Sequence, residues 1–466
     1  MSMNFFQAYN QFRKNTESHQ HFHLWAGISA ISTLLGKRCF IGQGMFDVFP
    51  HLYVVLVGQP ATKKSTAVNF AHRITQQVPE VSTAPSSASR ESLVDWLEST
   101  TIDYEVGGGK YYYSSAAVFA DEFASFVGGK HISESMITFL TEIYSCDTRP
   151  FKEIYRKSGK KIIEAPCLTL LGACTPSFFD KGVKTDIISG GFTRRTIFVY
   201  EDEVDHLVPI PVLTQEQTLA WPVLVKEANR IFKICGEFVL TKEAEALHTE
   251  YYIRDAQIKR EVNEKLASYY SSRHVLRFKI AMCLSAGYGS NRVVDSTIMK
   301  LADELLATTE FRLEELFRGV GRNELKLYQE RVLEFLHNSA KDTVKRRDIY
   351  RHLAADVTLA EFQEIMDALE RQGFIKSKVM IATDRPEDNV IVPMNKKLDR
   401  PFVNMFDRIC ARVETSEVKN QPVPAPNPPP GAVPIERKPK QDEAESQSVK
   451  PLPSLGKIKI KPGANR

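Results

Sequence analysis

One segment near the N-terminus restricts the fold of this chain more than any other. Residues 52–57 form an apolar, β-branched run that is typical of a buried strand, and the run stops at Gly58. A short loop follows, and a Lys-Ser-Thr sequence at residues 64–66 leads into a helical pattern that continues to Gln77. Strand, glycine loop and helix in this order predict a nucleotide phosphate-binding loop, because backbone N–H groups and a helix N-terminus then face the phosphates.

The side chains of this loop have separate expected roles. Lys64 is expected to bind the β- and γ-phosphates, and the Ser65 hydroxyl is expected to bind Mg²⁺. The loop departs from the usual motif at Lys63, where a glycine normally precedes the lysine. Lys63 either crowds the phosphates or turns outward, and we expect it to turn outward. The residues expected around the phosphates are Gly58, Gln59, Pro60, Ala61, Thr62, Lys63, Lys64, Ser65 and Thr66.

The composition is that of an ordinary globular protein. The 466 residues are enough for two or three domains with their own cores, and the net charge of +4 is too small to indicate nucleic-acid binding by itself. The seven cysteines lack zinc-ligand spacing, and no acid or cysteine follows the His19, His21 and His23 run at such spacing, so we expect no bound metal there. We expect reduced cysteines and a cytoplasmic protein, in the bacterial host cell if phage-encoded. A signal-peptide pattern and a membrane-length apolar run are both lacking, so no membrane partner is expected.

Strand-like and helical patterns alternate in the first half of the chain. Apolar runs at 52–57, 116–120, 167–173 and 195–200 are separated by helical patterns. This alternation predicts an α/β domain in which helices flank a largely parallel sheet, as in P-loop NTPases. Residues 214–320 are almost wholly helical in pattern.

The C-terminal part changes character twice. Helical patterns at 325–338, 345–354 and 358–372 are followed by strand-like runs at 374–382 and 389–393, which is the winged-helix order. The proline-rich end is too poor in apolar residues to fold. The predicted organisation is a helical N-terminal segment (1–50), a P-loop ATPase core (51–213), a helical subdomain (214–322), a winged-helix-like domain (323–397), a connecting segment (398–413) and a disordered Pro- and Lys-rich tail (414–466).

Polar residues follow the second and third predicted strands of the core. Phosphoryl transfer needs a carboxylate for Mg²⁺ and a water aligned with the phosphorus, and Asp121 and Glu122 suit these two roles. Thr175 follows the run 167–173, and strand carboxyl ends form the ligand crevice of a parallel sheet. Thr175 either binds the attacking water or the γ-phosphate, or it caps the helix that Pro176 begins.

Arg194 and Arg195 follow a glycine turn and precede the fourth predicted strand. An arginine from a neighbouring subunit can stabilise the transition state of phosphoryl transfer by roughly 10³- to 10⁵-fold. A solvated pair or a structural salt bridge is the alternative. Because the other parts of a hydrolysis site are present, we favour the role in a neighbouring subunit's site.

Several motifs occur in a characteristic order. They are Phe22-His-Leu-Trp25-Ala with Leu35-Gly36-Lys-Arg38, the loop from Val57 to Thr66, Phe119-Ala-Asp121-Glu122-Phe123, Leu140-Thr-Glu142-Ile-Tyr144, Gly172-Ala-Cys-Thr175-Pro176 and Gly190-Gly-Phe-Thr-Arg-Arg195. Over residues 5–300 the chain thereby resembles a phage and mobile-element ATPase family. Members of that family resemble replicative-helicase and primase-helicase P-loop proteins with a RecA-like or AAA+-like core, and they commonly carry Arg, Lys or Ser where Lys63 stands.

The resemblance implies roles for individual residues. It assigns Lys64 and Ser65 to phosphate and Mg²⁺, Asp121 and Glu122 to metal and water, Thr175 to a polar sensor, and Arg195 with Arg194 to a finger that acts on a neighbouring subunit. It also suggests Arg273 and Arg277 as further basic contacts, with helix-surface charges as the alternative.

The predicted winged helix carries opposite charges on neighbouring elements. Its second helix is basic and its third helix, 359–371, is acidic, which argues against reading of the major groove by the third helix. DNA contact and protein docking are therefore equally supported. The basic residues are Lys341, Lys345, Arg346, Arg347, Arg351, Lys376 and Lys378.

The sequence as a whole predicts a Mg²⁺-dependent ATPase that acts as a helicase-like motor in phage or mobile-element DNA replication, with ATP and Mg²⁺ as cofactors. The expected partners are single-stranded or replicating DNA, further copies of the chain (a hexameric ring is one such form), and replication proteins bound through the winged helix and the tail. Two alternatives stay open. One is a helicase loader or other non-translocating, DNA-associated ATPase switch, and the other is an interaction protein with an inactive nucleotide site.

Overall fold

The computed structural model describes residues 3–411 except for 107–108, 129–131, 147–150, 156–158, 179–190, 262–263, 290, 314–315, 317–324, 340–343, 355, 372–373, 379–389 and 394–404. The predicted disordered tail, Lys341 and Gly190 lie outside the described residues. None of the helices in the described part of the chain combines the length and the apolarity that a membrane span requires.

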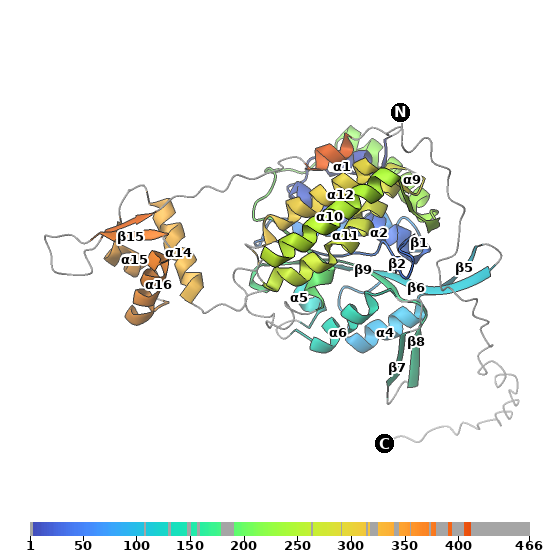
Figure 1. Cartoon of the computed structure of the whole chain (residues 1–466). Coiled ribbons are helices and arrows are strands. Elements are labelled where there is room, and N and C mark those ends of the chain that lie inside the picture. The colour runs from blue at the N-terminus through green and yellow to red at the C-terminus, as the bar shows by residue number, and fades with distance from the viewer. Residues whose placement is uncertain are drawn as a thin grey trace, which may run out of the picture.

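A six-stranded sheet lies at the centre of the main body, which comprises the described residues up to 316 together with 405–411 (Figure 1). Five strands run parallel, and the sixth pairs antiparallel with its neighbour. The parallel order is β10 (Thr196–Tyr200), β3 (Tyr53–Val57), β9 (Cys167–Cys174), β6 (Gly109–Ala120) and β4 (Ser82–Thr83), and β5 (Thr101–Val106) pairs with β6. β3 and β9 are buried along their whole length, as expected for central strands with both faces covered.

Helices cover both faces of the sheet. Thr169 of β9 lies 3.5 Å from the hydroxyl of Ser32 on one face. On the other face, the Tyr53 hydroxyl of β3 donates a hydrogen bond to the carbonyl of Leu140 at 3.0 Å. The covering helices are α2 (Gln20–Leu35) and α3 (Lys64–Thr75) on the first face, and α5 (Phe123–Phe126) and α6 (Glu134–Ile143) on the second.

The predicted α/β core is confirmed. The runs expected at 52–57, 116–120, 167–173 and 195–200 correspond to β3, β6, β9 and β10. Strands within residues 39–48 were not expected, because each is too short to show a sequence period. They form through distant pairing instead. β1 (Cys39–Gly42) pairs antiparallel with β2 (Asp47–Val48) and parallel with β11 (Gly236–Glu237).

The N-terminal and central helices share one hydrophobic core with the sheet. These helices are α1 (Phe5–Arg13), α9 (Gln215–Phe232), α10 (Lys242–Glu261), α11 (Glu264–Tyr288) and α12 (Ser296–Glu310). The smaller elements of the main body are α4 (Arg90–Ser99), η1 (Gly36–Arg38), β7 (Phe151–Tyr155), β8 (Gly159–Ile163), β12 (Val239–Leu240) and β13 (Val293–Val294). All seven cysteines are free, and five of them are buried.

A helix near the end of the described chain belongs to the same core. α17 (Met405–Cys410) lies in the segment expected to be a connection, and its Phe406 stacks on Tyr9 of α1. The Tyr288 hydroxyl donates a hydrogen bond to the carbonyl of Ile409 at 2.8 Å, and the Arg408 guanidinium lies 2.8 Å from the Glu304 carboxylate. Residues 405–410 are therefore part of the main body and not a free connection.

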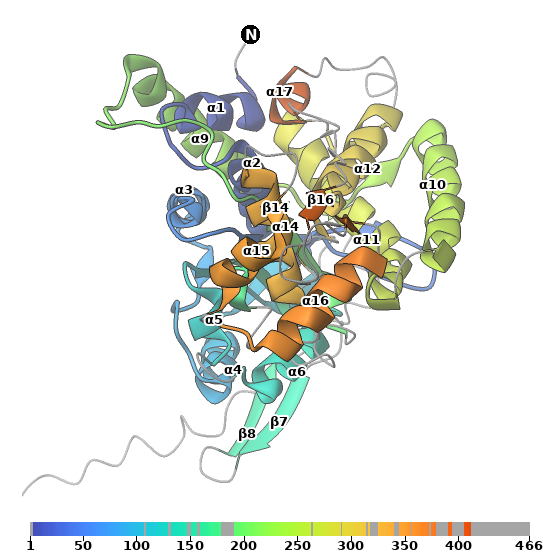
Figure 2. The same ribbon diagram turned by 90° about the vertical axis from the view of Figure 1, so that its left-hand side faces the viewer.

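Residues between 325 and 393 form a second, smaller unit with its own hydrophobic core (Figure 1 and Figure 2). Its three-stranded sheet is antiparallel, with β16 in the middle. In chain order the elements are α14 (Leu325–Asn338), β14 (Val344–Lys345), α15 (Arg346–Leu353), α16 (Leu359–Arg371), β15 (Ile375–Lys378) and β16 (Val390–Pro393).

Arg273 and Arg277 are buried in an ion cluster, so neither is a helix-surface charge or a contact open to a ligand. Nη1 of Arg273 lies 2.9 Å from Asp255 and 2.7 Å from Asp303, and its Nε lies 2.7 Å from Glu310. Arg277 contacts the same two aspartates. Three acids from neighbouring helices therefore compensate the charges of two arginines inside the protein. A local sequence pattern could not predict these ion pairs.

Asp303→Ala is expected to lower the free energy of unfolding by about 3–5 kcal/mol, because it removes one of the two aspartates that Arg273 and Arg277 share and leaves an excess of buried positive charge. Burial alone would raise the pKa of Asp303, but a hydrogen bond from Arg254 and the two buried arginines lower it. Its stabilising effect is therefore present above the unfolded pKa and is lost as pH falls through the lower folded pKa. Urea denaturation at neutral pH measures the change.

Asp95→Ala is the control for this variant. The Asp95 carboxylate lies 3.1 Å from Lys161, but it is about half exposed, with a side-chain exposure of 51%. Loss of such a pair costs less than about 1 kcal/mol. Equal destabilisation by the two substitutions would contradict the assigned importance of the buried cluster.

Candidate nucleotide site

The loop between β3 and α3 requires glycine at its first position. A Cβ atom at Gly58 would lie 2.4 Å from the backbone oxygen of Glu201 and 2.8 Å from the Thr62 hydroxyl. The Gly58 N–H donates a hydrogen bond to the carbonyl of Cys174 at 3.3 Å, which fixes the start of the loop to the end of β9. The chain therefore enters the loop at a position where a side chain does not fit.

Lys63 adopts a left-handed backbone conformation, with φ 57° and ψ 28°. This geometry explains why glycine is usual at the position, since a residue with a Cβ adopts it at a cost of about 1–2 kcal/mol. The side chain of Lys63 is half exposed, and its ammonium lies 3.1 Å from the carboxylate of Glu17. Lys63 is thus turned outward, as expected, and its backbone still supplies the conformation that begins α3.

The ammonium of Lys64 is held by oxygens of its own loop. It donates hydrogen bonds to the carbonyls of Gly58 and Gln59, both at 2.8 Å, and to the Thr62 hydroxyl at 3.1 Å. Burial lowers the pKa of this amine. The N-terminus of α3 adds its positive end to the same place, and no side-chain hydrogen bond from Lys63 caps it. A cation and a helix N-terminus are therefore combined in one loop.

Asp121, Glu122 and Thr175 lie at the same edge of the sheet as this loop. Val57 of β3 pairs with Cys174 of β9, and Gly172 of β9 pairs with Ala120 of β6, so the three strands end together. Asp121 and Glu122 follow β6, and Thr175 follows β9. Parallel strands place such residues on one side of the crevice at their carboxyl ends. The structure therefore places Asp121, Glu122 and Thr175 at the sheet edge that also carries Lys64 and Ser65.

Asp121 is linked directly to the helix that begins with Lys64. Its carboxylate accepts a hydrogen bond from Asn69 of α3, although burial raises its pKa overall. Asn69 was not predicted as a site residue, yet it stands four positions after Ser65 and so shares a helix face with it. A polar residue four positions after Ser65 could therefore have been predicted from the sequence as a site residue. The Thr175 hydroxyl lies 2.8 Å from that of Ser177.

Arg194 and Arg195 lie at the opposite edge of the sheet. They belong to the short helix η2 (Thr193–Arg195), which immediately precedes β10. Since β10 pairs with β3 from Thr196 to Tyr200, the length of the strand, about 16 Å, separates the arginines from the loop. Within one chain, the structure does not bring these arginines to the phosphate loop.

A cluster of histidines and acids borders the loop. Nδ1 of His21 lies 2.7 Å from the Glu201 carboxylate, and Nε2 of His19 lies 3.8 Å from it. The Glu201 N–H donates to the carbonyl of Val57, which places the cluster beside the end of β3. No acid follows these histidines at ligand spacing in the sequence, but the fold supplies Glu201 from a distant part of the chain. The same carboxylate is also bound by Arg312 at 3.1 Å, and this compensates its charge without a metal ion.

No protein-family model matches this chain, and no curated protein matches it. The class of protein therefore rests on fold and geometry alone. The fold is α/β, with a mostly parallel sheet flanked by helices, and it is compatible with a P-loop-like fold.

Proposed function

We propose that this chain is a Mg²⁺-dependent ATPase that acts as a helicase-like motor on DNA in phage or mobile-element replication. The observation that carries the proposal is the position of the Lys64 ammonium. It is held at the centre of a strand-to-helix loop, on the sheet edge that also carries Asp121, Glu122 and Thr175. A cation, a helix N-terminus and carboxylates at one crevice are what nucleotide hydrolysis requires.

The residues at this edge suit Mg²⁺. Magnesium prefers oxygen ligands, and the Ser65 hydroxyl and the Asp121 carboxylate supply oxygens from elements that the Asn69–Asp121 hydrogen bond joins. When bound, the ion would neutralise charge on the β- and γ-phosphates. Ser65 and Asp121 are the residues that would hold it.

Hydrolysis of ATP would follow from the roles of the remaining side chains. Glu122 accepts a proton from water, the water oxygen forms a bond to the γ-phosphorus, and the bond to the leaving ADP oxygen breaks. Lys64 stabilises the negative charge that spreads over the γ-phosphate oxygens. Thr175 orients the water or the γ-phosphate by a hydrogen bond. The products are ADP and phosphate.

The position of Arg195 supports a homo-oligomer, of which a hexameric ring is one form. Arg195 lies at the sheet edge opposite its own loop, so it can act on a bound nucleotide only from a neighbouring copy. Closed rings form when one surface of a subunit contacts a different surface of the next. In this arrangement each site combines the loop of one chain with Arg195 of another.

The smaller C-terminal unit supports a second candidate function, a helicase loader or other non-translocating ATPase switch. Its element order is that of a winged helix. α15 begins with Arg346 and Arg347, whereas α16 carries Glu361, Glu364 and Asp367. An acidic helix at the groove-reading position repels DNA phosphates, and this favours docking onto a protein.

Single-stranded DNA is expected to raise the ATPase rate severalfold, and the protein is expected to separate a DNA duplex that carries a single-stranded end. Steady-state phosphate release with and without single-stranded DNA measures the first effect, and a strand-displacement assay measures the second. Nucleotide-dependent binding to a replicative helicase without strand displacement would favour the loader. Failure of the purified protein to bind ATP would instead favour an interaction protein with an inactive site.

A further inference from the structure

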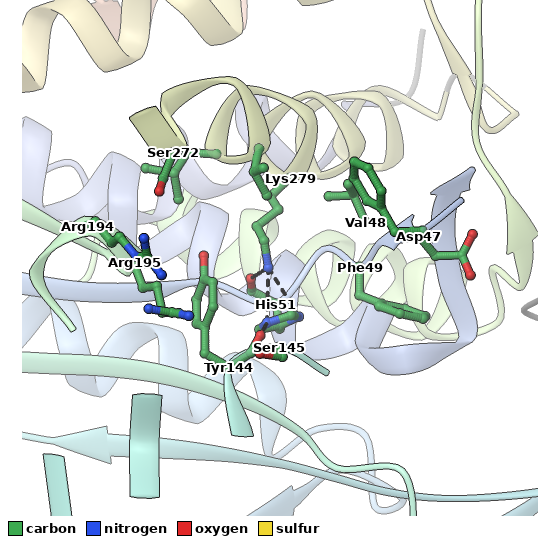
Figure 3. A pocket seen from close by; sticks show the side chains of 13 residues that line it. Asp47, Val48, Phe49, His51, Tyr144, Ser145, Arg194, Arg195, Ser272 and Lys279 are labelled. Carbon is green, nitrogen blue, oxygen red and sulfur yellow. Dashed lines mark hydrogen bonds between the residues drawn. The ribbon is translucent and has the colours of Figure 1, made fainter. Parts of the chain in front are cut away.

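A cavity of about 300 Å³ opens at the sheet edge opposite the nucleotide loop. It lies between α11, the segment 46–51 before β3, the residues that follow α6, and η2 (Figure 3). The predicted function uses only Arg194 and Arg195 of its walls. The remaining polar groups have no role in the nucleotide site described above.

Three cationic side chains border the cavity, namely Arg194, Arg195 and Lys279. Lys279 is only 2% exposed, and among the described residues its ammonium forms hydrogen bonds with His51 alone, at 2.9 Å to the carbonyl oxygen and 3.0 Å to Nε2. Among the described residues that border the cavity, Asp47 is the one carboxylate, and Figure 3 shows it pointing away from Lys279. The cations are therefore gathered without an acid between them.

Burial beside other cations disfavours the charged forms of Lys279 and Arg195. Burial lowers the pKa of Lys279 to about 7, and burial together with the neighbouring Arg194 lowers the pKa of Arg195. The nearby Cys146 thiol opposes this shift at Lys279, but the ammonium has no carboxylate partner among the described residues that border the cavity, and ionisable groups with strongly shifted pKa values are concentrated at functional sites. An anion in the cavity would favour the charged forms.

The ring of Tyr144 lies close to both Lys279 and Arg195, and its hydroxyl is a hydrogen-bond donor without a partner among the described residues. The centre of its ring lies 4.3 Å from the Lys279 ammonium and 5.8 Å from the Arg195 guanidinium. The residue is 8% exposed, and its hydroxyl has no hydrogen-bond partner among the described residues. Figure 3 shows this hydroxyl pointing into the cavity. A buried hydroxyl of this kind is expected to have a partner, and the cavity is where one would bind.

We propose that this cavity is a phosphate-binding site in which Lys279, Arg195 and the Tyr144 hydroxyl bind one phosphate group. All three side chains donate hydrogen bonds, and a phosphate offers acceptor oxygens in several directions. The phosphate comes either from a nucleotide bound to a neighbouring copy of the chain or from the backbone of single-stranded nucleic acid. The first source rests on the proposed function, and the second does not require Arg195 to act in hydrolysis.

Titration with inorganic phosphate tests the site without ATP, so the result does not depend on whether the protein hydrolyses nucleotide. The titration uses a Lys64→Ala background, which weakens binding at the nucleotide loop, and isothermal calorimetry near pH 7 as the readout. Tyr144→Phe is expected to weaken phosphate binding about tenfold, because one hydrogen bond to a charged group is lost. Lys279→Met is expected to abolish binding, because the ammonium that would bind the phosphate is removed.

Tyr53→Phe is the matched control. Its hydroxyl is buried and already donates to Leu140, outside the cavity. This variant is expected to lose stability and to keep the phosphate affinity of its parent. Phosphate binding that survives both Tyr144→Phe and Lys279→Met, or that is missing from the Lys64→Ala parent, would overturn the proposal.

The ATPase rate and the affinity for single-stranded DNA, measured for Lys279→Met in an otherwise wild-type chain, distinguish the two sources of the phosphate. If the phosphate belongs to a neighbour's nucleotide, the ATPase rate falls and the affinity for single-stranded DNA does not. If it belongs to nucleic acid, DNA affinity falls and the slope of log affinity against log salt decreases by about one. Loss of phosphate binding with no change in either activity would contradict both sources.

Discussion

Arg195→Ala protein is expected to hydrolyse ATP about 10³- to 10⁵-fold more slowly than wild type, while ATP binding stays within a few-fold. The guanidinium would stabilise charge that develops in the transition state at a neighbour's site, so kcat falls more than affinity. Steady-state ATPase measurements and equilibrium binding of a fluorescent ATP analogue separate the two effects. Arg194→Ala is the adjacent control, and a larger loss in Arg194→Ala than in Arg195→Ala would exchange the roles of the two arginines.

Mixing two inactive variants tests whether the arginine acts between subunits. Arg195→Ala chains keep an intact loop, and Lys64→Ala chains keep an intact arginine. In randomly mixed oligomers about a quarter of the interfaces combine both intact parts, so part of the wild-type activity should return. Mixed oligomers that form, as shown by co-purification of differently tagged chains, and yet show no activity would contradict the proposal.

Lys64→Ala is expected to lower kcat/KM for ATP by about 10²- to 10³-fold, because a preorganised cation at the phosphates is lost. In the structure the three donors of the ammonium are used by Gly58, Gln59 and Thr62, so at least one of these hydrogen bonds is exchanged for a phosphate oxygen when nucleotide binds. The same substitution also removes the hydrogen bonds that hold the loop, and circular dichroism should confirm that the fold is intact.

Lys63→Ala provides an adjacent control for the loss of a lysine. Lys63 is turned outward and contacts Glu17, so its loss should leave kcat/KM within about threefold. Lys63→Gly, which restores the usual motif residue, should likewise keep activity and relieve the left-handed backbone. A loss in Lys63→Ala as large as that in Lys64→Ala would show that the outward position is not the functional one.

Local sequence patterns account for the architecture of the core. Buried β-branched runs predict β3 and β9, and parallel strands then place Asp121 and Thr175 at the edge that carries the loop. The α/β core could be predicted for this reason, since each strand carries its own signal. The positions of the site residues follow from the direction of the strands.

Pairings between distant residues could not be predicted in the same way. Glu201 is separated from His21 by most of the α/β core, and Arg273 depends on acids from two other helices. A charged residue in a helical pattern is normally expected at the surface, so the burial of Arg277 could not be predicted from the pattern. Lys279 likewise stands in an apolar stretch of α11, and only the packing of η2 and Tyr144 against that helix reveals its cavity.

The return of α17 to the main body has a practical consequence for truncation. Residues 325–393 are an insertion between α12 and α17, and both of these flanking helices belong to one core. A chain that stops after residue 393 loses Met405, Phe406 and Ile409 from that core together with whatever follows. To separate the smaller unit from the main body, it must be excised internally and the two cut ends rejoined. A C-terminal deletion would measure damage to the main body instead.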